Sequence, residues 1–304
     1  MVMVTPLIDS PVLSATAGVP VSLKAECLQE TGSFKVRGAA NALLALSPQR
    51  RESGVVAVSS GNHGRAVAYV AKALGIRATI CLSARVPAFK VEAIVALGAR
   101  VVVGGPDQFD AETAARRLVA GEGLTFIHPF DDPTVIAGQG TIGLEVLDER
   151  PDTRALVVPL SGGGLISGIA AAVRGGDRTI DVFGVSQDRG PAMYDSLRAG
   201  RVVPVVEVDT LADALAGGLG EENRHTFEMC RSLLTDTVLV GERAIAEAMR
   251  LLHGEHGLRV EGGGAVGVAA VLSGVLSVAG PTVIVLSGGN VGDEDFARVL
   301  AGAS

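Results

Sequence analysis

Short aliphatic runs alternate with helical patterns along most of this chain, and this alternation constrains the fold more than any other feature. The run at 55–58 is typical, because it is apolar at every position. A strand that is apolar on both faces must be covered on both faces, as in parallel sheets built from β-α-β units. The expected strands are 55–58, 78–82, 100–103, 124–127, 155–158, 180–185, 238–240 and 282–286. The expected helices are 39–46, 65–74, 88–97, 111–120, 134–147, a helix ending at 173, 244–252 and 265–272. The sequence therefore predicts an α/β fold of doubly wound open sheets.

Length and composition favour two domains with aliphatic cores. The chain has 304 residues, which is long for one core. Apolar residues make up 48% and aromatic residues only 3%, so Val, Leu, Ile and Ala must fill the interior. Because no flexible linker is apparent, we expect one domain to be inserted into the other rather than tethered to it.

Charge and cysteine usage exclude several classes of function. The formal net charge is −7 and no Lys/Arg-rich run offsets it, so nucleic acid is not an expected partner. Three widely spaced cysteines form no C-x-x-C motif, which fits a reducing compartment better than a disulfide framework. We expect no signal peptide and no membrane span, since the N-terminus lacks a basic region and the apolar stretches are short and interrupted by glycine. The expected location is the cytoplasm.

Glycine, serine and asparagine gather at the ends of the expected strands, where open α/β sheets bind ligands. A glycine turn before a helix presents free backbone N–H groups, so it is suited to binding an anion. The best candidate for a phosphate is the turn at 161–164, although a plain tight turn would have the same sequence. The four segments are Ser59-Ser60-Gly61-Asn62-His63-Gly64, Ser161-Gly162-Gly163-Gly164, Glu261-Gly262-Gly263-Gly264 and Ser287-Gly288-Gly289-Asn290.

The spacing Gly262-x-Gly264-x-x-Gly267 also matches a dinucleotide-binding fingerprint. A convincing strand does not precede it, and no acidic residue follows within about twenty positions, as the fingerprint requires. We therefore interpret these glycines as sites of close helix packing, with dinucleotide binding as the weaker alternative.

Lys35 lies among apolar residues at the entry to the expected helix 39–46. Taken alone, it is more typical of an exposed lysine at a helix start. A lysine in a partly apolar pocket, however, has a lowered pKa and can form a Schiff base. Together with a downstream glycine turn for a phosphate, Lys35 becomes a candidate for covalent attachment of a cofactor.

Four ordered motifs make the chain similar to a known family. They are Ser33-Phe34-Lys35-x-Arg37-Gly38-Ala39, Ser60-Gly61-Asn62-His63-Gly64, Ser161-Gly162-Gly163-Gly164-Leu165 and Leu286-Ser287-Gly288-Gly289-Asn290. Over residues 5–291 the chain resembles the fold-type II (tryptophan synthase beta-like) enzymes that use pyridoxal 5'-phosphate (PLP), in particular the serine/threonine dehydratases and serine racemases. Segments 128–133 and 136–141 also look like this family. Segments 188–197, 210–213 and 223–227 look closest to its hydroxyectoine-utilisation dehydratases.

The resemblance implies a role for each matching residue. Lys35 would form the Schiff base and remove the Cα proton. The cofactor would further contact the ring-packing Phe34, Asn62 at its phenolic oxygen, residues Ser161, Gly162, Gly163, Gly164 and Leu165 at its phosphate, and Ser287 at its pyridine nitrogen. The substrate carboxylate would be bound by Ser59, Ser60, Gly61, Asn62 and His63. Ser60 would also be catalytic, on the ring face opposite Lys35. A neutral serine at the pyridine nitrogen favours expulsion of a β-hydroxyl over transamination.

The implied reaction is β-elimination of water from a small β-hydroxy amino acid, such as L-threonine or L-serine, giving a 2-oxo acid and ammonia. The implied fold has two open-sheet domains with the cofactor between them: a large domain of residues 1–47 and 134–304, and a small inserted domain of residues 48–133 that closes over the site. The resemblance also implies a homodimer.

Several positions depart from the family pattern. Metal-binding relatives have a glutamate and an aspartate where Ser186 and Ala192 stand, so we predict no divalent cation, with Asp188 as a weaker alternative ligand. Phe130 replaces an asparagine usual in racemases, which favours a dehydratase. Arg65 replaces a glutamine; it is either a solvated helix residue or a partner for the distal carboxylate of a substrate such as 3-hydroxyaspartate. The chain ends soon after Ser287, so we expect no regulatory domain and no inhibition by isoleucine.

Three hypotheses remain open. The first is a PLP-dependent dehydratase acting on threonine, serine, 3-hydroxyaspartate or a hydroxyectoine-derived substrate. The second is an amino-acid racemase or a β-replacement enzyme. The third is a small-molecule binding module, which would not need Lys35, Ser60 and Ser287 together.

Overall fold

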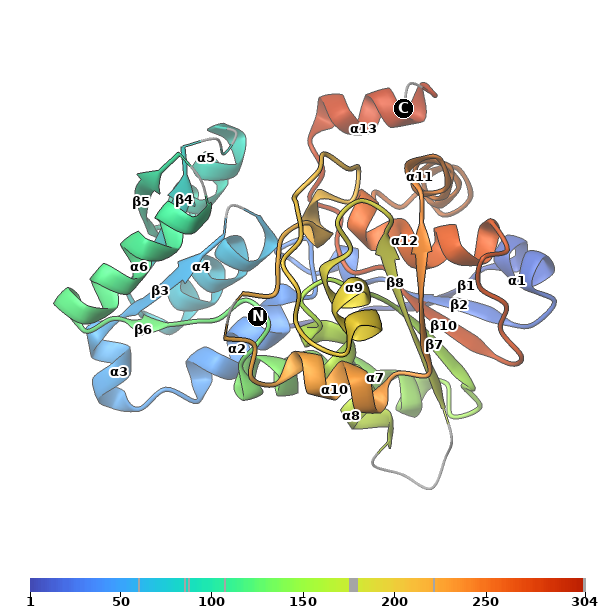
Figure 1. Ribbon diagram of the computed structural model, residues 1–304, viewed down its shortest axis with the longest axis horizontal. Helices are drawn as coiled ribbons and strands as arrows, with labels where there is room; N and C mark the ends of the chain where they lie inside the picture. Colours follow the sequence, from blue (N-terminus) through green and yellow to red (C-terminus); the bar gives the residue numbers. More distant parts are fainter. Residues whose placement is uncertain are drawn as a thin grey trace. The chain divides into compact units, whose positions relative to one another are not determined.

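The computed structural model describes residues 1–59, 61–84, 86, 88–106, 108–174, 180–220 and 222–302. The chain forms two compact units (Figure 1). The first unit comprises Met1–Met3 and Gln29–Gly138, and the second comprises Val4–Leu28 and Gln139–Ser304. The sequence places residues 29–47 in the large domain, whereas their contacts group them with the first unit, because α2 (Lys35–Leu44) packs on α4 (Asn62–Leu74).

The first unit is built on a parallel sheet with the strand order β5-β4-β3-β6. Its strands are β3 (Val55–Val58), β4 (Ala78–Ser83), β5 (Arg100–Gly105) and β6 (Thr125–Phe126). Its helices, besides α2 and α4, are α3 (Pro48–Ser53), α5 (Ala88–Ala96), α6 (Gln108–Glu122) and the first residues of α7 (Pro133–Glu149).

Strand β3 shows why its sequence is apolar throughout. Val55 and Ala57 pack into a core with α2 and α4, whereas Val56 and Val58 pack into a second core with α6. Successive side chains of a strand point to opposite faces, so a sheet that is covered on both faces requires apolar residues at every position.

The second unit contains a sheet with the strand order β1-β2-β10-β7-β8-β9, in which β1 is antiparallel and the other pairs are parallel. Its strands are β1 (Leu7–Asp9), β2 (Val21–Lys24), β7 (Ala155–Pro159), β8 (Asp181–Gln187), β9 (Asp236–Val240) and β10 (Thr282–Val285). Its helices include α1 (Pro11–Ala17), α8 (Gly164–Arg174), α9 (Ala192–Ala199), α10 (Thr226–Leu233), α11 (Glu242–His256), α12 (Gly262–Leu272) and α13 (Asp293–Leu300).

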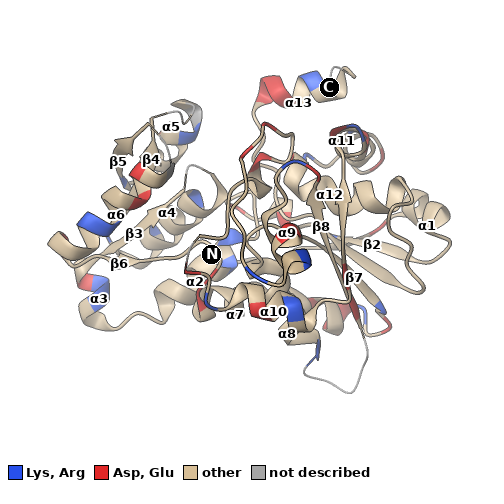
Figure 2. Ribbon diagram, in the orientation of Figure 1, with Lys and Arg blue, Asp and Glu red and all other residues tan. Residues whose placement is uncertain are grey.

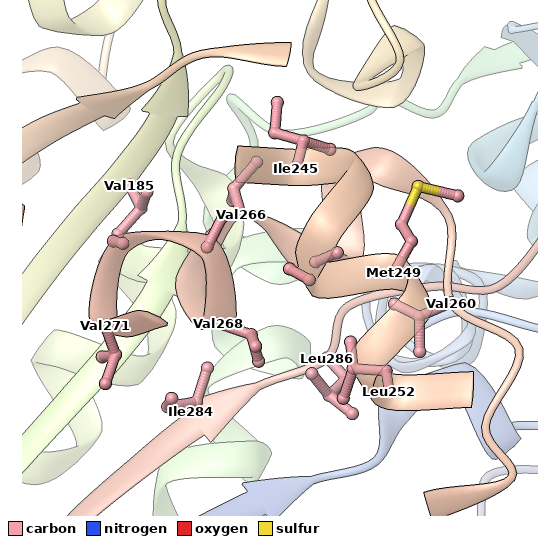
Figure 3. Close-up of a cluster of buried hydrophobic side chains, with 14 of the residues drawn as sticks. Val185, Ile245, Met249, Leu252, Val260, Val266, Val268, Val271, Ile284 and Leu286 are labelled. Atoms are coloured by element: carbon pink, nitrogen blue, oxygen red, sulfur yellow. The ribbon is translucent and has the colours of Figure 1, made fainter. Parts of the chain in front are cut away.

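Helix α12 packs directly on this sheet, with Val266 and Val268 in the same core as Ile284 (Figure 3). A Cβ at Gly267 would lie 2.7 Å from Ile284 Cγ2. At Gly262 a Cβ would lie 2.1 Å from the Leu211 carbonyl oxygen. Both glycines are therefore needed for close approach, and the interpretation of this motif as helix packing is confirmed.

The predicted fold class is confirmed, and most predicted elements lie within two or three residues of their observed bounds. Two local differences matter. Helix α2 begins at Lys35 rather than at residue 39, so the lysine lies in its first turn. Strand β2 was not predicted. In the structure, Lys24 is fully buried and its Nζ lies 2.9 Å from Glu145 and 3.1 Å from Glu149.

Charged residues of both signs are scattered over the elements of each unit (Figure 2). One local concentration is the first turn of α13, where Asp293, Glu294 and Asp295 lie at the helix N-terminus and Arg298 lies in the last turn. This order of charges matches the helix dipole. Within the described residues, no helix is both long enough and apolar enough to span a membrane.

Candidate active site

The parallel pairing of β10 with β7 brings two of the predicted turns to one edge of the second sheet. Val283 pairs with Leu156, and Ile284 pairs with Val157. The carboxyl ends of neighbouring parallel strands meet at the same edge, where ligands bind in open α/β sheets. The turn after β7, which begins at Ser161, and Ser287, which follows β10, therefore lie at this edge.

The turn from Ser161 to Gly164 leads directly into α8, and its backbone conformation and packing both require glycine at position 163. Gly163 has φ +85°, in the left-handed region. A Cβ there would lie 2.8 Å from Met193 Cε and 3.0 Å from Cys230 Sγ. The backbone N–H groups at the start of α8 are thus presented by a turn without side-chain bulk, an arrangement suited to a phosphate. Leu165 is buried in the first turn of the helix.

Ser287 lies two residues beyond β10 and is buried. The segment that follows is fixed by α12, because the Gly288 carbonyl oxygen accepts a hydrogen bond of 3.0 Å from the Glu261 N–H. A Cβ at Gly264 would lie 2.6 Å from the same carbonyl oxygen. The backbone around Ser287 is therefore held by close packing on both sides.

Lys35 lies in the first turn of α2, in the first unit. Its Nζ donates a hydrogen bond of 2.7 Å to the Pro129 carbonyl oxygen. The same Nζ lies 5.3 Å from the centroid of the Phe34 ring, and the side chain is half-buried. A primary amine is thus presented next to an aromatic face and beside a backbone acceptor.

Two imidazoles lie in this region, and both have lowered pKa values. Burial, helped by the positive charge of Lys35, lowers the pKa of His63 to about 3. Burial lowers the pKa of His128 to about 4, and Lys35 acts in the same direction against Asp131 and Asp132. Both rings are therefore neutral near pH 7, and each can donate one hydrogen bond and accept another.

The turn from Ser59 to Gly64 connects β3 to α4 and includes several predicted substrate-binding residues. The Gly61 N–H donates to Ser59 Oγ at 3.2 Å, Asn62 begins the helix, and His63 is buried. A Cβ at Gly64 would lie 2.3 Å from the Ser59 carbonyl oxygen, so this position requires glycine. Ser60, predicted to be catalytic, lies outside the described residues.

The chain has the features that a phosphate-bearing aldehyde cofactor requires. It has a primary amine at Lys35 and a bare glycine turn at 161–164. Within the described part of the chain, two buried polar atoms of the first unit have no hydrogen-bond partner: Ser33 Oγ and His63 Nδ1. Buried polar atoms normally have hydrogen-bond partners. Ser33 is two residues from Lys35 in the sequence, and His63 interacts electrostatically with Lys35. The two atoms without partners are therefore consistent with a polar ligand near Lys35.

The structure groups the predicted site residues by unit. The first unit contains Phe34, Lys35, Ser59, Gly61, Asn62 and His63, and the second contains Ser161 to Leu165 and Ser287. Sequence reasoning assigned no role to His128 or Pro129, although both lie in the 128–133 segment of the resemblance. It assigned no site role to Met193, Thr226 and Cys230, which lie next to Gly163, although Met193 and Thr226 belong to two of the segments quoted for the resemblance.

Two of the positions considered for a metal, 186 and 192, do not offer a free oxygen ligand. Ser186 Oγ donates to Gln187 Oε1 at 3.0 Å, and Ala192 begins α9. Across the described residues, no cluster of three or more His, Cys, Asp or Glu side chains is suited to hold a metal ion. The absence of a divalent cation stays a prediction.

Comparisons with known proteins agree with the predicted family. A family described as "Pyridoxal-phosphate dependent enzyme" matches residues 2–288. The chain is 52% identical to a "Putative threonine dehydratase" of Sinorhizobium fredii, over 94% of this chain and 87% of that protein. It is 44% identical to the "L-threonine ammonia-lyase" of Thermotoga maritima, over 97% of this chain and 73% of that protein.

A solved structure shows the same fold. Maize serine racemase superposes with a TM-score of 0.92 at 33% identity, covering 99% of this chain and 92% of that chain. Taken with the lysine, the glycine turn and the family match over nearly the whole length, this similarity assigns the cofactor and the fold type together. The chain belongs to the pyridoxal-phosphate dependent enzymes, with the fold of the serine racemases and threonine dehydratases.

Proposed function

We propose that this chain is a PLP-dependent dehydratase, an ammonia-lyase that eliminates water from a small β-hydroxy amino acid such as L-threonine or L-serine. The observation that carries the proposal is the amine of Lys35, presented from the first turn of α2 beside the Phe34 ring, in a chain whose relatives are named as threonine dehydratases. Phe130 in place of the racemases' asparagine favours elimination over racemisation.

The cofactor would be held by the residues that the resemblance assigns to it. Lys35 would bond to it covalently, and Phe34 and Asn62 would contact its ring and phenolic oxygen. In the second unit, the backbone N–H groups of Ser161 to Leu165 would hold its phosphate, and Ser287 would donate to its pyridine nitrogen. The left-handed Gly163 and the buried Ser287 support these two assignments, since both are fixed by their packing.

With the substrate bound, Lys35 Nζ would take the proton from the substrate Cα. The bound cofactor supplies an electron-withdrawing ring that stabilises the negative charge left at that carbon. Loss of the Cα proton and of the β-hydroxide together would amount to loss of one water, and the resulting unsaturated amine would take up one water to give the 2-oxo acid and ammonia. For L-threonine the products are 2-oxobutanoate and ammonia.

The substrate carboxylate would be bound by the turn from Ser59 to His63. Its support is the position of this turn at the N-terminus of the 13-residue helix α4, where backbone N–H groups and the helix dipole favour an anion. Ser60 would face the side of the cofactor ring opposite Lys35, where it binds the carboxylate or acts as an acid. Neutral His63 adds no positive charge beside Lys35.

The proposal is tested by an absorbance scan of the purified protein with an assay of 2-oxo acid from L-threonine. Lys35→Ala should lose the cofactor band near the visible edge and lower kcat by at least about 1,000-fold, because it removes both the attachment point and the base. The matched control is Lys72→Ala, an exposed lysine of α4. Activity retained in Lys35→Ala, or no band after incubation with PLP, would overturn the proposal.

A second substrate class is favoured by Arg65, which is half-buried in the first turn of α4 and follows the carboxylate-binding turn. A guanidinium at this position can pair with the distal carboxylate of 3-hydroxyaspartate. We expect Arg65→Gln to lower kcat/KM for 3-hydroxyaspartate relative to threonine by about 10-fold or more. An unchanged ratio would show that Arg65 does not select acidic substrates. A hydroxyectoine-derived substrate is assayed in the same series.

We further propose a homodimer in the cytoplasm. Cys27, Cys81 and Cys230 are all buried as free thiols, which fits a reducing compartment. The predicted division into a large domain (1–47 and 134–304) and a small one (48–133) is retained as part of this proposal. Light scattering coupled to size exclusion tests the dimer, since a mass near the 30.9 kDa of one chain would contradict it.

A further inference from the structure

The segment of residues 127–131 connects β6 to α7 without regular secondary structure. Its backbone groups therefore need partners outside a helix or a sheet ladder. Its first residue is held by a strand, since the Ile127 N–H donates to the Val56 carbonyl oxygen at 2.9 Å. The two imidazoles described above provide further partners.

His63 and His128 hold this segment through opposite ring nitrogens. His63 Nε2–H donates to the Ile127 carbonyl oxygen at 2.9 Å. His128 Nδ1 accepts from the Phe130 N–H at 3.2 Å and from the Asp131 N–H at 2.7 Å. One histidine acts as a donor and the other as an acceptor, and together they fix the backbone on both sides of Pro129.

The acceptor role of His128 depends on a neutral ring. Nδ1 can accept the two N–H groups only when it carries no proton. Burial keeps the pKa of His128 near 4 and that of His63 near 3, so both rings are neutral at physiological pH. The hydrogen-bond pattern is therefore maintained under the conditions in which the enzyme works.

Pro129 lies between the two anchored ends, and its carbonyl oxygen accepts the hydrogen bond of Lys35 Nζ. A neutral amine that donates one N–H to a fixed acceptor directs its lone pair away from that acceptor. When Lys35 takes up a proton, the same carbonyl stabilises the ammonium through a charge-assisted hydrogen bond. The position of one backbone carbonyl therefore restricts the directions from which Lys35 can accept a proton.

We propose that His63 and His128 are positioning residues for Lys35, which act by securing residues 127–131 so that the Pro129 carbonyl holds and orients the lysine amine. This inference rests on the proposed function of Lys35 as the base. In this proposal the two histidines fix the backbone that contacts the base, and the Pro129 carbonyl oxygen orients the amine of the base.

Asparagine and glutamine provide a matched test, because they place similar amides at different distances from the backbone. The asparagine side chain reaches about as far as imidazole Nδ1, and the glutamine side chain reaches about as far as Nε2. At His128, where Nδ1 is used, His128→Asn should preserve the anchor and His128→Gln should not. At His63, where Nε2 is used, His63→Gln should preserve it and His63→Asn should not.

The four variants are compared as holoenzymes by kcat for 2-oxo acid formation and by amide hydrogen exchange of the peptide covering residues 127–131. We expect His128→Gln and His63→Asn to lower kcat about 10- to 100-fold, as small misplacement of a catalytic group does, and to speed exchange by at least about 10-fold. His128→Asn should remain within about 3-fold of the wild type in kcat. His63 also belongs to the proposed carboxylate-binding turn, so its two variants are compared with each other: His63→Gln should keep a kcat at least about 10-fold higher, and an amide exchange at least about 10-fold slower, than His63→Asn. His253→Gln, at an exposed position of α11, controls for loss of a histidine.

The crossed pattern cannot arise from a general tolerance to size, since the better amide differs between the two sites. Equal behaviour of asparagine and glutamine at each site, or the reversed order, would overturn the proposal. A pair that differs in exchange but not in kcat would overturn the link to Lys35. If one pair does not fold, the other pair decides. Exchange needs no turnover, so failure of the proposed function, seen as wild-type protein that forms no 2-oxo acid, is distinguished from failure of the anchor.

Discussion

Two turns of this enzyme have nearly the same sequence pattern and position but provide different chemistry. The turn from Ser59 to Gly64 follows β3 and begins α4, and the turn from Ser161 to Gly164 follows β7 and begins α8. The first includes side chains with polar groups, among them Asn62 and the buried His63. The second has one side chain, that of Ser161, followed by three glycines, and Gly163 packs against Met193, Thr226 and Cys230.

The difference teaches that a glycine in such a turn can serve two separate purposes. Gly64 is required because a neighbouring backbone oxygen approaches closely, so the turn can close while its other residues keep their side chains. Gly163 is required mainly because its φ of +85° is unfavourable for other residues. The first turn is thus suited to recognise a ligand through side chains and backbone together, and the second mainly through backbone N–H groups.

The largest effect is expected from Gly64→Ala. The new Cβ would lie 2.3 Å from the Ser59 carbonyl oxygen, a backbone atom that cannot move without opening the turn. We expect the free energy of unfolding to fall by about 3 kcal/mol, measured by urea denaturation. A loss below about 0.5 kcal/mol would show that the turn closes in another way, and that the Ser59 carbonyl oxygen does not make glycine necessary at position 64.

A smaller effect is expected on the pH dependence of the free energy of unfolding, and it arises from the His63 side chain in the first turn. The pKa of His63 falls from its ordinary 6.5 to about 3 on folding, so below about pH 6.5 the unfolded chain binds a proton that the folded chain does not. Stability is therefore full above that pH and falls by about 1.4 kcal/mol per pH unit as pH decreases towards the folded pKa.

Substitution His63→Gln removes this titration. Between pH 6 and pH 4.5 the stability of the variant should fall by about 2 kcal/mol less than that of the wild type, because the other titrating groups are common to both. Urea denaturation at both pH values provides the comparison. Parallel pH profiles for the two proteins would mean that His63 is not held neutral by burial.

The smallest effect is expected from Gly163→Ala in the second turn. The nearest atom to the new Cβ is the flexible end of Met193, so the main cost is the left-handed backbone, about 1–2 kcal/mol. We expect this loss of stability together with about 10-fold weaker affinity for PLP, measured by absorbance titration, since the anion-binding N–H groups shift. Affinity unchanged from the wild type would argue that the phosphate is bound elsewhere.

Much of the fold could be predicted because local sequence reports burial. The run Val55 to Val58 is apolar on both faces, which identified a parallel strand, and the order of four motifs identified the family. Strand β2 could not be predicted in the same way. Lys24 is compatible with burial only because Glu145 and Glu149, more than a hundred residues later, provide its ion pairs.

The candidate site shows the same limit. Lys35 was identified by its motif, yet its observed hydrogen-bond partner is the carbonyl of Pro129, which carries no side-chain signal. The roles of His63 and His128 could not be assigned from the sequence either. Which ring nitrogen is used, and whether the ring is neutral, depend on burial and on neighbours from other elements.

The sequence by itself determined the α/β class, the glycine turns and the membership of the PLP-dependent enzymes, and it predicted which lysine would bind the cofactor, because these depend on residue type and order. Only the tertiary structure decided that Ser161 and Ser287 lie at one sheet edge, that Gly163 rests on Cys230, and that two neutral histidines hold the segment contacting Lys35. These features depend on strand pairing and desolvation, which bring together groups distant in the chain and are not encoded at any single position.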